Sequence, residues 1–352
     1  MIAVDRRVVP MPAGDVDTKK ISLFVTGGTG FFGRSLLRYL ARMNDAAGST
    51  PVSATVLSRS PARFLALYPE FADLPWLSFH TGDVLGDLSG FPEDQEFSHV
   101  FHAAADSTLG PRMAPLDRFE QIVAGTRNML DLAVKTGSKR FLLTSSGGVY
   151  GPQPPGLERV PETFLGMPDP LSAHNVYGVA KRAAEHLCAL YGETHGLTTV
   201  VARCFAFVGP DLPLDVHFAI GNFVRDALDR PEVVVNGNGS PLRSYLYQDD
   251  LAHWLMTLLT KGQGGEAYNV GSDEAISIAD LAHLVRDLLA PGKPVRVRGV
   301  ADDNAAARNR YVPNIDKARR DLALQVSTPL EKAIRLTAAG GGGNFAKQVA
   351  YE

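Results

Sequence analysis

The sequence has few cysteines, no long apolar run and no large excess of charge. Its 352 residues include only Cys188 and Cys204, which excludes a disulfide framework and favours a reducing, cytoplasmic compartment. No stretch approaches the roughly 18–20 apolar residues of a membrane span, and the charged N-terminus lacks the apolar core of a secretory signal. The formal net charge of −3 argues against a basic nucleic-acid-binding surface.

Residues with the spacing of metal ligands are also missing. His99 and His102 lie close together in the sequence, but on a strand their side chains point to opposite faces. No cluster of acids, histidines or cysteines has metal spacing, so we expect no metal site. The composition, with 45% hydrophobic and 21% charged residues, is that of a globular protein large enough to bury a sizeable core.

Short apolar runs alternate with segments of helical periodicity in the first part of the chain. The runs cover residues 21–26, 54–57, 77–79, 98–102, 140–144 and 198–202. Apolar residues recur at helical spacing in the segments between several of these runs. Alternation of this kind predicts right-handed crossovers and an α/β fold, a Rossmann-like doubly wound parallel sheet covered by helices on both faces.

Glycine and proline punctuate shorter elements after about residue 205, which predicts a change of organisation. We expect a flexible leader at residues 1–19, a dinucleotide-binding domain at 20–205 and a smaller part that mainly binds substrate at 206–338. A run of four glycines predicts a flexible tail at 339–352. Helices in the smaller part are expected at residues 217–228, 249–260 and 278–289.

A glycine-rich segment follows the first strand and opens the first helix. It contains Gly27, Thr29, Gly30, Phe31, Phe32 and Gly33. Glycines at this spacing allow a tight turn and a close approach of the backbone to a pyrophosphate. The helix N-terminus that follows offers unpaired N–H groups and the positive end of its dipole. The segment therefore predicts a dinucleotide-binding site.

The second strand indicates which dinucleotide is bound. Sites for NAD usually place an acid at the end of this strand for the ribose 2′-hydroxyl. Here Ser58 and Arg59 stand there instead, and both suit a 2′-phosphate, with Arg34 as a possible helper. The sequence therefore favours NADP(H), with NAD(H) as the alternative. Asp83, followed by Val84 after the third strand, is expected near the adenine ring.

Three further residues predict proton-transfer chemistry. Tyr177 and Lys181 are four residues apart and share one face of a helix, and Ser146 follows the strand at 140–144. The pKa of a free tyrosine is about 10, but a neighbouring ammonium and an oxidised nicotinamide favour the phenolate. Tyr177 then takes a proton from a sugar hydroxyl while hydride leaves carbon. Lys181 would also hold the nicotinamide ribose, and Ser146 would orient the reacting oxygen.

These features resemble the extended short-chain dehydrogenases/reductases, in the branch of nucleotide-sugar epimerases and dehydratases. The resemblance covers residues 21–330. Beyond the residues already named, the matching motifs lie at residues 102–105, 125–130, 145–151, 243–250 and 268–271. The family also dimerises through two helices per subunit, here at residues 119–134 and 176–191, which implies a homodimer with a four-helix bundle.

The resemblance also implies contacts for particular residues. It places Ala103, Ala104 and Ala105 against the cofactor. Arg243 matches an arginine that binds the nucleotide-sugar pyrophosphate, a bidentate task that suits its guanidinium. The full set of implied substrate contacts is Asp106, Ser146, Gly147, Asn222, Arg243 and Arg308.

Departures from the family pattern bear on the reaction. Dehydratases and decarboxylases carry an acid where this chain has Gly148, next to Gly147. Relatives usually have asparagine at Ala206, and an arginine is expected at Asn304. The first interpretation is a nucleotide-diphosphate-sugar epimerase acting at C4. The alternatives are an NADPH-dependent 4-ketoreductase, a 4,6-dehydratase and a non-catalytic dinucleotide-binding module, against which the intact Ser146, Tyr177 and Lys181 argue.

Overall fold

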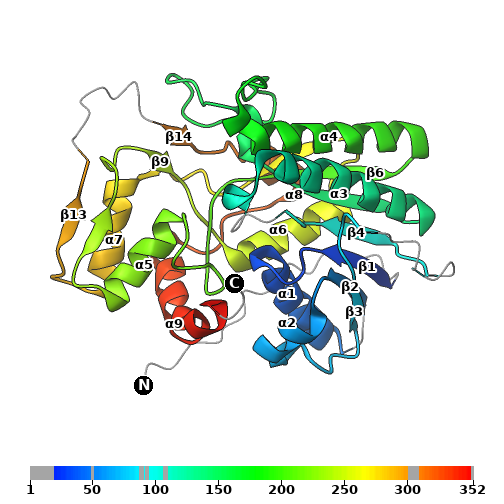
Figure 1. The fold of residues 1–352 in the computed structure, drawn as a ribbon, viewed down its shortest axis with the longest axis horizontal. Coiled ribbons are helices and arrows are strands. Elements are labelled where there is room, and N and C mark those ends of the chain that lie inside the picture. Colours follow the sequence, from blue (N-terminus) through cyan, green and yellow to red (C-terminus); the bar gives the residue numbers. More distant parts are fainter. Residues whose placement is uncertain are drawn as a thin grey trace.

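A seven-stranded parallel sheet forms the centre of the molecule (Figure 1). The computed structural model describes residues 20–48, 51–86, 91, 95–105, 110–299 and 309–349. The strands lie in the order β11-β6-β5-β4-β1-β2-β3, and every neighbouring pair is parallel. Their bounds are β1 Ile21–Thr26, β2 Val52–Ser58, β3 Leu77–Thr81, β4 His99–His102, β5 Arg140–Ser146, β6 Thr198–Cys204 and β11 Ala267–Val270. The predicted α/β fold is thus confirmed.

Helices cover both faces of this sheet, because alternate strand residues point to opposite sides. Leu23 and Val25 of β1 pack in one apolar cluster with α1 and α6, whereas Phe24 between them packs in another with α3 and α4. The helices are α1 Phe31–Ala47, α2 Pro61–Leu67, α3 Pro115–Lys135, α4 Val176–His195 and α6 Gln248–Lys261. Among the described residues, no helix combines the length and apolar character needed to cross a membrane.

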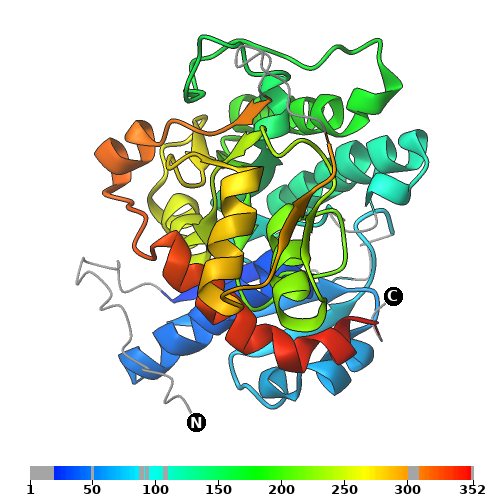
Figure 2. The same ribbon diagram turned by 90° about the vertical axis from the view of Figure 1, so that its left-hand side faces the viewer.

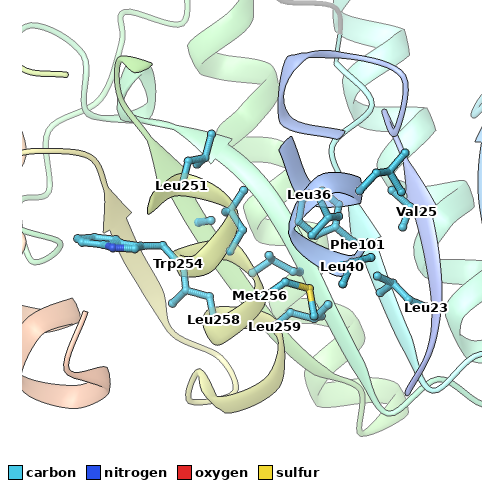
Figure 3. Packing of buried hydrophobic residues seen from close by; sticks show 14 of the residues in the cluster. Leu23, Val25, Leu36, Leu40, Phe101, Leu251, Trp254, Met256, Leu258 and Leu259 are labelled. Carbon is cyan, nitrogen blue, oxygen red and sulfur yellow. The ribbon is translucent and has the colours of Figure 1, made fainter. Parts of the chain in front are cut away.

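The cluster under α1 and α6 is the larger core (Figure 3). Leu36 and Leu40 of α1 face the strands from the same side as Trp254 and Leu258 of α6. Trp254 is fully buried, and its indole N–H donates a hydrogen bond to the carbonyl of Gln325, 3.1 Å away. This bond satisfies the polar atom of the largest buried side chain, so the core carries it without a desolvation penalty.

The rest of the chain builds a smaller part beside the carboxyl ends of the strands. There α5, α7 and α9 pack on one another around a separate apolar cluster (Figure 2). Its helices are α5 Ala219–Asp229, α7 Ile278–Leu289 and α9 Leu330–Val349. The short helix α8 Asp316–Leu322 packs instead against β11 and α6 in the larger core. The strands are β7 Phe207–Val208, β8 Val233–Val235, β9 Leu242–Arg243, β10 Leu246–Tyr247, β12 Ile276–Ser277, β13 Val295–Val297 and β14 Arg310–Tyr311.

The boundaries of these parts differ from the sequence prediction in two places. The expected sheet domain stops at residue 205, yet α6 and β11 lie beyond it and join the central sheet and its covering layer. The expected tail begins at residue 339, yet α9 continues to Val349. Glycine weakens a helix, but a Cβ at Gly340 would lie 2.4 Å from Pro210 Cβ, so close packing requires glycine there. The expected leader at 1–19 lies outside the described residues.

A buried ion pair joins the two parts of the molecule. Asp211 accepts a hydrogen bond from Arg34 Nε at 3.2 Å and from Gln248 Nε2 at 3.1 Å, and it also pairs with Arg38. Arg34 in turn donates to the carbonyl of Thr29 in the glycine loop, 3.2 Å away. Arg34 was expected to assist with a 2′-phosphate. That expectation is wrong, because its guanidinium is held in the interior by Asp211.

Candidate active site

The glycine loop lies between β1 and α1 and touches the end of β4. Gly27 has φ of 71°, and a Cβ there would lie 2.5 Å from the carbonyl oxygen of Ala103, so only glycine fits. Gly30 caps α1, and within the described residues no side chain caps this helix end and its first turn holds no acid. Unpaired N–H groups and an open positive helix end suit the pyrophosphate of a dinucleotide, so the loop fits this cofactor.

The carboxyl ends of β2 and β3 bring together the residues expected at the adenosine end. Arg59 Nε lies 3.9 Å from Asp83 Oδ2, and the Arg59 side chain is 71% exposed. Ser58 is buried, and its hydroxyl accepts a hydrogen bond from the N–H of Ser60 at 3.3 Å. Val84 is buried next to Gly125 of α3. Arg59 is therefore the exposed cation of this group.

Below the loop, His102 is part of the scaffold. One ring nitrogen lies 2.7 Å from Thr26 Oγ1 and the other lies 3.2 Å from Thr126 Oγ1. The N–H of Ala104 also donates to Thr26 Oγ1, so this network orients the segment of Ala103, Ala104 and Ala105. Complete burial lowers the pKa of His102 to about 3, so the ring stays neutral at physiological pH.

The tyrosine, the lysine and the serine meet at the carboxyl end of β5. Tyr177 and Lys181 belong to the first turns of α4, which begins beside the short helix Gly147–Tyr150. A Cβ at Gly178 would lie 2.6 Å from the carbonyl oxygen of Gly148, so glycine permits this close approach. Lys181 Nζ donates to the carbonyl of Thr144 at 2.7 Å and lies 5.9 Å from the centre of the Tyr177 ring.

Only some of the predicted substrate residues lie near Tyr177 and Ser146 in the structure. Arg243 donates to the carbonyl of Asn309 at 3.1 Å, and within the described residues no carboxylate pairs with it. Burial lowers the pKa of its guanidinium, as expected for a cation without a counter-ion. Asn222 lies in the smaller part, where it lines cavities of about 530 Å³ and 250 Å³ that neither Tyr177 nor Ser146 lines. Asp106 and Arg308 lie outside the described residues.

Comparison with known proteins gives this arrangement a family. The profile of the NAD dependent epimerase/dehydratase family matches residues 23–271. The chain belongs to that family. It is therefore an enzyme of the nucleotide-sugar branch that its motifs predict, works with a dinucleotide cofactor, and is not a bare binding module.

Individual relatives span several reactions. UDP-glucuronic acid decarboxylase 6 of Arabidopsis thaliana is 27% identical over 332 residues, covering 93% of this chain and 92% of that protein. A double mutant of the dTDP-glucose 4,6-dehydratase DesIV from Streptomyces venezuelae, solved with NAD, has a TM-score of 0.75 and 26% identity, covering 92% of this chain and 98% of its own. A UDP-galactose 4-epimerase has a TM-score of 0.70 and 25% identity, covering 94% and 100%.

The pKa of the Tyr177 phenol in this family member was expected to be lowered. The expected lowering depends on Lys181 and the oxidised nicotinamide together; in the protein alone, burial raises the pKa of Tyr177, opposed by a hydrogen bond with Ser146 and by the charge of Arg118. Burial also lowers the pKa of Lys181 to about 8, opposed first by Cys204 and Glu185. The protein alone therefore keeps the phenol protonated, and more positive charge is needed to form the phenolate.

Two residues that the sequence analysis missed complete the surroundings of the phenol in this enzyme. The Tyr311 hydroxyl lies 3.3 Å from Ser146 Oγ and donates to the carbonyl of Cys204 at 3.2 Å. The guanidinium carbon of Arg118 lies 4.5 Å from the centre of the Tyr177 ring. Tyr311 pairs with Arg243 through β14 and β9, and Arg118 comes from α3. Neither has a local motif, because both reach the site through tertiary packing.

A polar network behind α4 supports Lys181 in the same enzyme. Glu185, one helical turn further along, accepts hydrogen bonds from Ser145 Oγ at 2.6 Å and from Arg203 at 2.8 Å. Arg203 also donates to the hydroxyl of Tyr150 at 3.0 Å. These bonds hold α4 against the ends of β5 and β6. They thereby fix the position of Lys181, which lies on the same helix as Glu185.

The buried lysine predicts a dependence of stability on pH. The pKa of Lys181 is about 8 when folded against an ordinary value of 10.5, so between these values the unfolded chain binds the proton more tightly. The stability contributed by this residue therefore rises with pH in that window. Relative to Lys181→Met, which does not titrate, the wild type should gain about 2.5 kcal/mol between about pH 7 and pH 10.

Urea unfolding of both proteins at the two pH values measures this gain. Lys135→Met replaces an exposed lysine at the end of α3 and serves as the matched control, for which we expect no such change. If the free energies of unfolding of wild type and Lys181→Met differ by the same amount at both pH values, burial does not lower the pKa of Lys181 and the prediction is wrong.

Proposed function

We propose that this enzyme is a nucleotide-diphosphate-sugar 4-epimerase. The observation that carries the proposal is the pair Gly147 and Gly148 beside the catalytic candidates. A Cβ at Gly148 would lie 3.3 Å from Ser146 Oγ and 3.9 Å from Tyr177 Cδ1, so an acid at this position would face the reacting groups. Elimination of water needs an acid and a base beyond Tyr177. Epimerisation needs only the tyrosine proton and a reversible hydride transfer.

The residues around Tyr177 have clear roles in such a reaction. When bound, the oxidised dinucleotide supplies a reversible hydride acceptor for sugar C4. The Tyr177 hydroxyl oxygen takes the proton of the C4 hydroxyl and later returns it. Ser146 Oγ orients the sugar oxygen, and Lys181 holds the nicotinamide ribose and adds positive charge. Arg243 holds the pyrophosphate, so that the sugar turns over about an anchored end.

A second candidate, an NADPH-dependent nucleotide-4-keto-sugar reductase, is favoured by one observation. Ser58 and Arg59 replace the acid expected for NAD, and NADPH serves net reduction. Two relatives are named as a decarboxylase and a 4,6-dehydratase. These reactions are less well supported for this enzyme, because Gly148 has no side chain to act as the acid or base.

The products formed from a panel of substrates test these candidates. The panel contains UDP-, dTDP-, GDP- and CDP-hexoses, their 4-keto forms and UDP-glucuronate, with products identified by NMR. We expect a C4 epimer without net change in NAD(P)H absorbance. Consumption of NADPH with a 4-keto sugar would select the reductase, and loss of water or carbon dioxide would overturn the proposal.

The acid–base role of Tyr177 is tested in the same assay. Tyr177→Phe keeps the ring and removes only the ionisable oxygen, so turnover should fall by roughly 10²- to 10⁴-fold. Binding of the nucleotide sugar should barely change, because Arg243 lies on a different element. Turnover close to that of the wild type would move the acid–base role to another residue.

We further propose that the cofactor is NADP(H), held at its 2′-phosphate by Arg59. Removing this exposed cation in Arg59→Ala should weaken NADPH binding by roughly 1–3 kcal/mol, the value of a charge-assisted hydrogen bond. NADH has no 2′-phosphate, so its affinity is the internal control. Titration calorimetry with both cofactors measures the difference, and an equal loss for both would rule out the assignment.

We also propose that the enzyme is a homodimer in which α3 and α4 form a four-helix bundle with their copies. These helices lie side by side, and both expose large apolar side chains, including Leu116 at 82% and Leu190 at 41% (Figure 1). Burying such residues against a second copy would remove them from water. Light scattering at micromolar concentration should give the mass of a dimer, and a monomer would refute the proposal.

A further inference from the structure

Arg118 occupies an unusual position on the face of the Tyr177 ring. Its guanidinium carbon lies 4.5 Å from the ring centre, within the range of a cation–π contact. Arg118 is the fourth residue of α3, which begins at Pro115, and its side chain is half-buried. Cations are unfavourable in the first turn of a helix because of the positive end of the dipole. The contact with Tyr177 is one favourable interaction that acts against this cost.

Among the other described groups that face Tyr177, Lys181 is the cation, and its charge depends on pH. Ser146 and Cys204 reach it from the ends of β5 and β6, and Tyr311 reaches it from β14. Lys181 lies on the same helix, but burial lowers its pKa to about 8. Arginine keeps its charge at every pH at which proteins are active. Arg118 thus supplies a charge that does not titrate.

His217 adds no charge of its own to this region. Burial lowers its pKa, and the neighbouring charges of Arg118 and Arg112 lower it further, which keeps the ring neutral. Within the described residues, the charge on the face of the Tyr177 ring that does not titrate therefore comes from Arg118.

We propose that Arg118 is a positioning residue that stabilises the phenolate of Tyr177 through the face of its ring. The neutral phenol attracts the guanidinium only through its quadrupole, whereas the phenolate carries a full negative charge that is shared with the ring. The attraction therefore grows when the proton leaves, and this favours ionisation. The inference rests on the proposed acid–base role of Tyr177 and goes beyond it by assigning a second cation to that group.

Three variants separate charge, shape and position. Arg118→Gln removes the charge, and Arg118→Lys keeps it without the flat guanidinium. Arg127→Gln makes the same change about two and a half turns further along α3. There Arg127 forms an exposed pair with Asp131, so this variant serves as the matched control. Circular dichroism confirms that each variant is folded.

The first measurement follows ionisation without turnover. The protein is produced with tyrosine labelled at Cζ and saturated with NAD+ or NADP+, and the Tyr177 signal is assigned from Tyr177→Phe. In Arg118→Gln the pH of half-ionisation should rise by about 0.4–1.5 pH units. Arg118→Lys should shift less, and Arg127→Gln should not shift. An unchanged value in Arg118→Gln overturns the proposal.

The second measurement is the pH profile of turnover on the substrate found with the panel. The acid limb of kcat should move to higher pH in Arg118→Gln, with a loss of roughly 2- to 30-fold below it and KM within about twofold. A raised KM with an unchanged kcat would make Arg118 a substrate ligand and overturn the proposal. If no panel substrate reacts, the function proposal fails, and the titration still decides the role of Arg118.

Discussion

A fully buried ammonium group is the constraint on which the candidate active site depends. Lys181 is only 3% exposed, and its Nζ has the carbonyl of Thr144 as a hydrogen-bond acceptor. Burying a charge is costly, and here burial draws the pKa down to about 8. The surrounding polar network of Glu185, Arg203 and Ser145 holds α4 in place, and no carboxylate of the described residues pairs directly with the lysine. The ammonium therefore interacts strongly with any charge that develops near Tyr177.

The electrostatics of the phenol follow from the same burial. The site that makes Lys181 easier to deprotonate also makes Tyr177 harder to ionise, because both effects arise from the loss of water around a charge. A cation on the ring face and a positive nicotinamide act in the same direction and offset that penalty. In the proposed mechanism the tyrosine acts as a base once the cofactor adds its positive charge, because the protein alone raises the pKa of the phenol.

The local sequence pattern was sufficient to predict the elements and motifs that depend on residues close together in the chain. The periodicity located β1 at Ile21–Thr26 and α7 at Ile278–Leu289 with their observed bounds. The glycine loop, the strand end at Ser146 and the helical spacing of Tyr177 and Lys181 are likewise local. Residues that reach the site across the fold escaped prediction. Arg34 lies beside the glycine loop in sequence but pairs with Asp211, 177 residues away, and Tyr311 meets Ser146 across 165 residues.

The return of α6 and β11 to the central sheet means that the two parts of this enzyme are not separable modules. The chain leaves the sheet after β6, comes back for α6 and β11, leaves for α7, and returns once more with α8 before it ends in α9. A fragment that ends at residue 205 would expose the edge of β6 and the apolar layer that Trp254 and Leu258 cover. The substrate-binding part therefore cannot be cut away or exchanged as one contiguous segment without removing a strand and a covering helix of the cofactor-binding sheet.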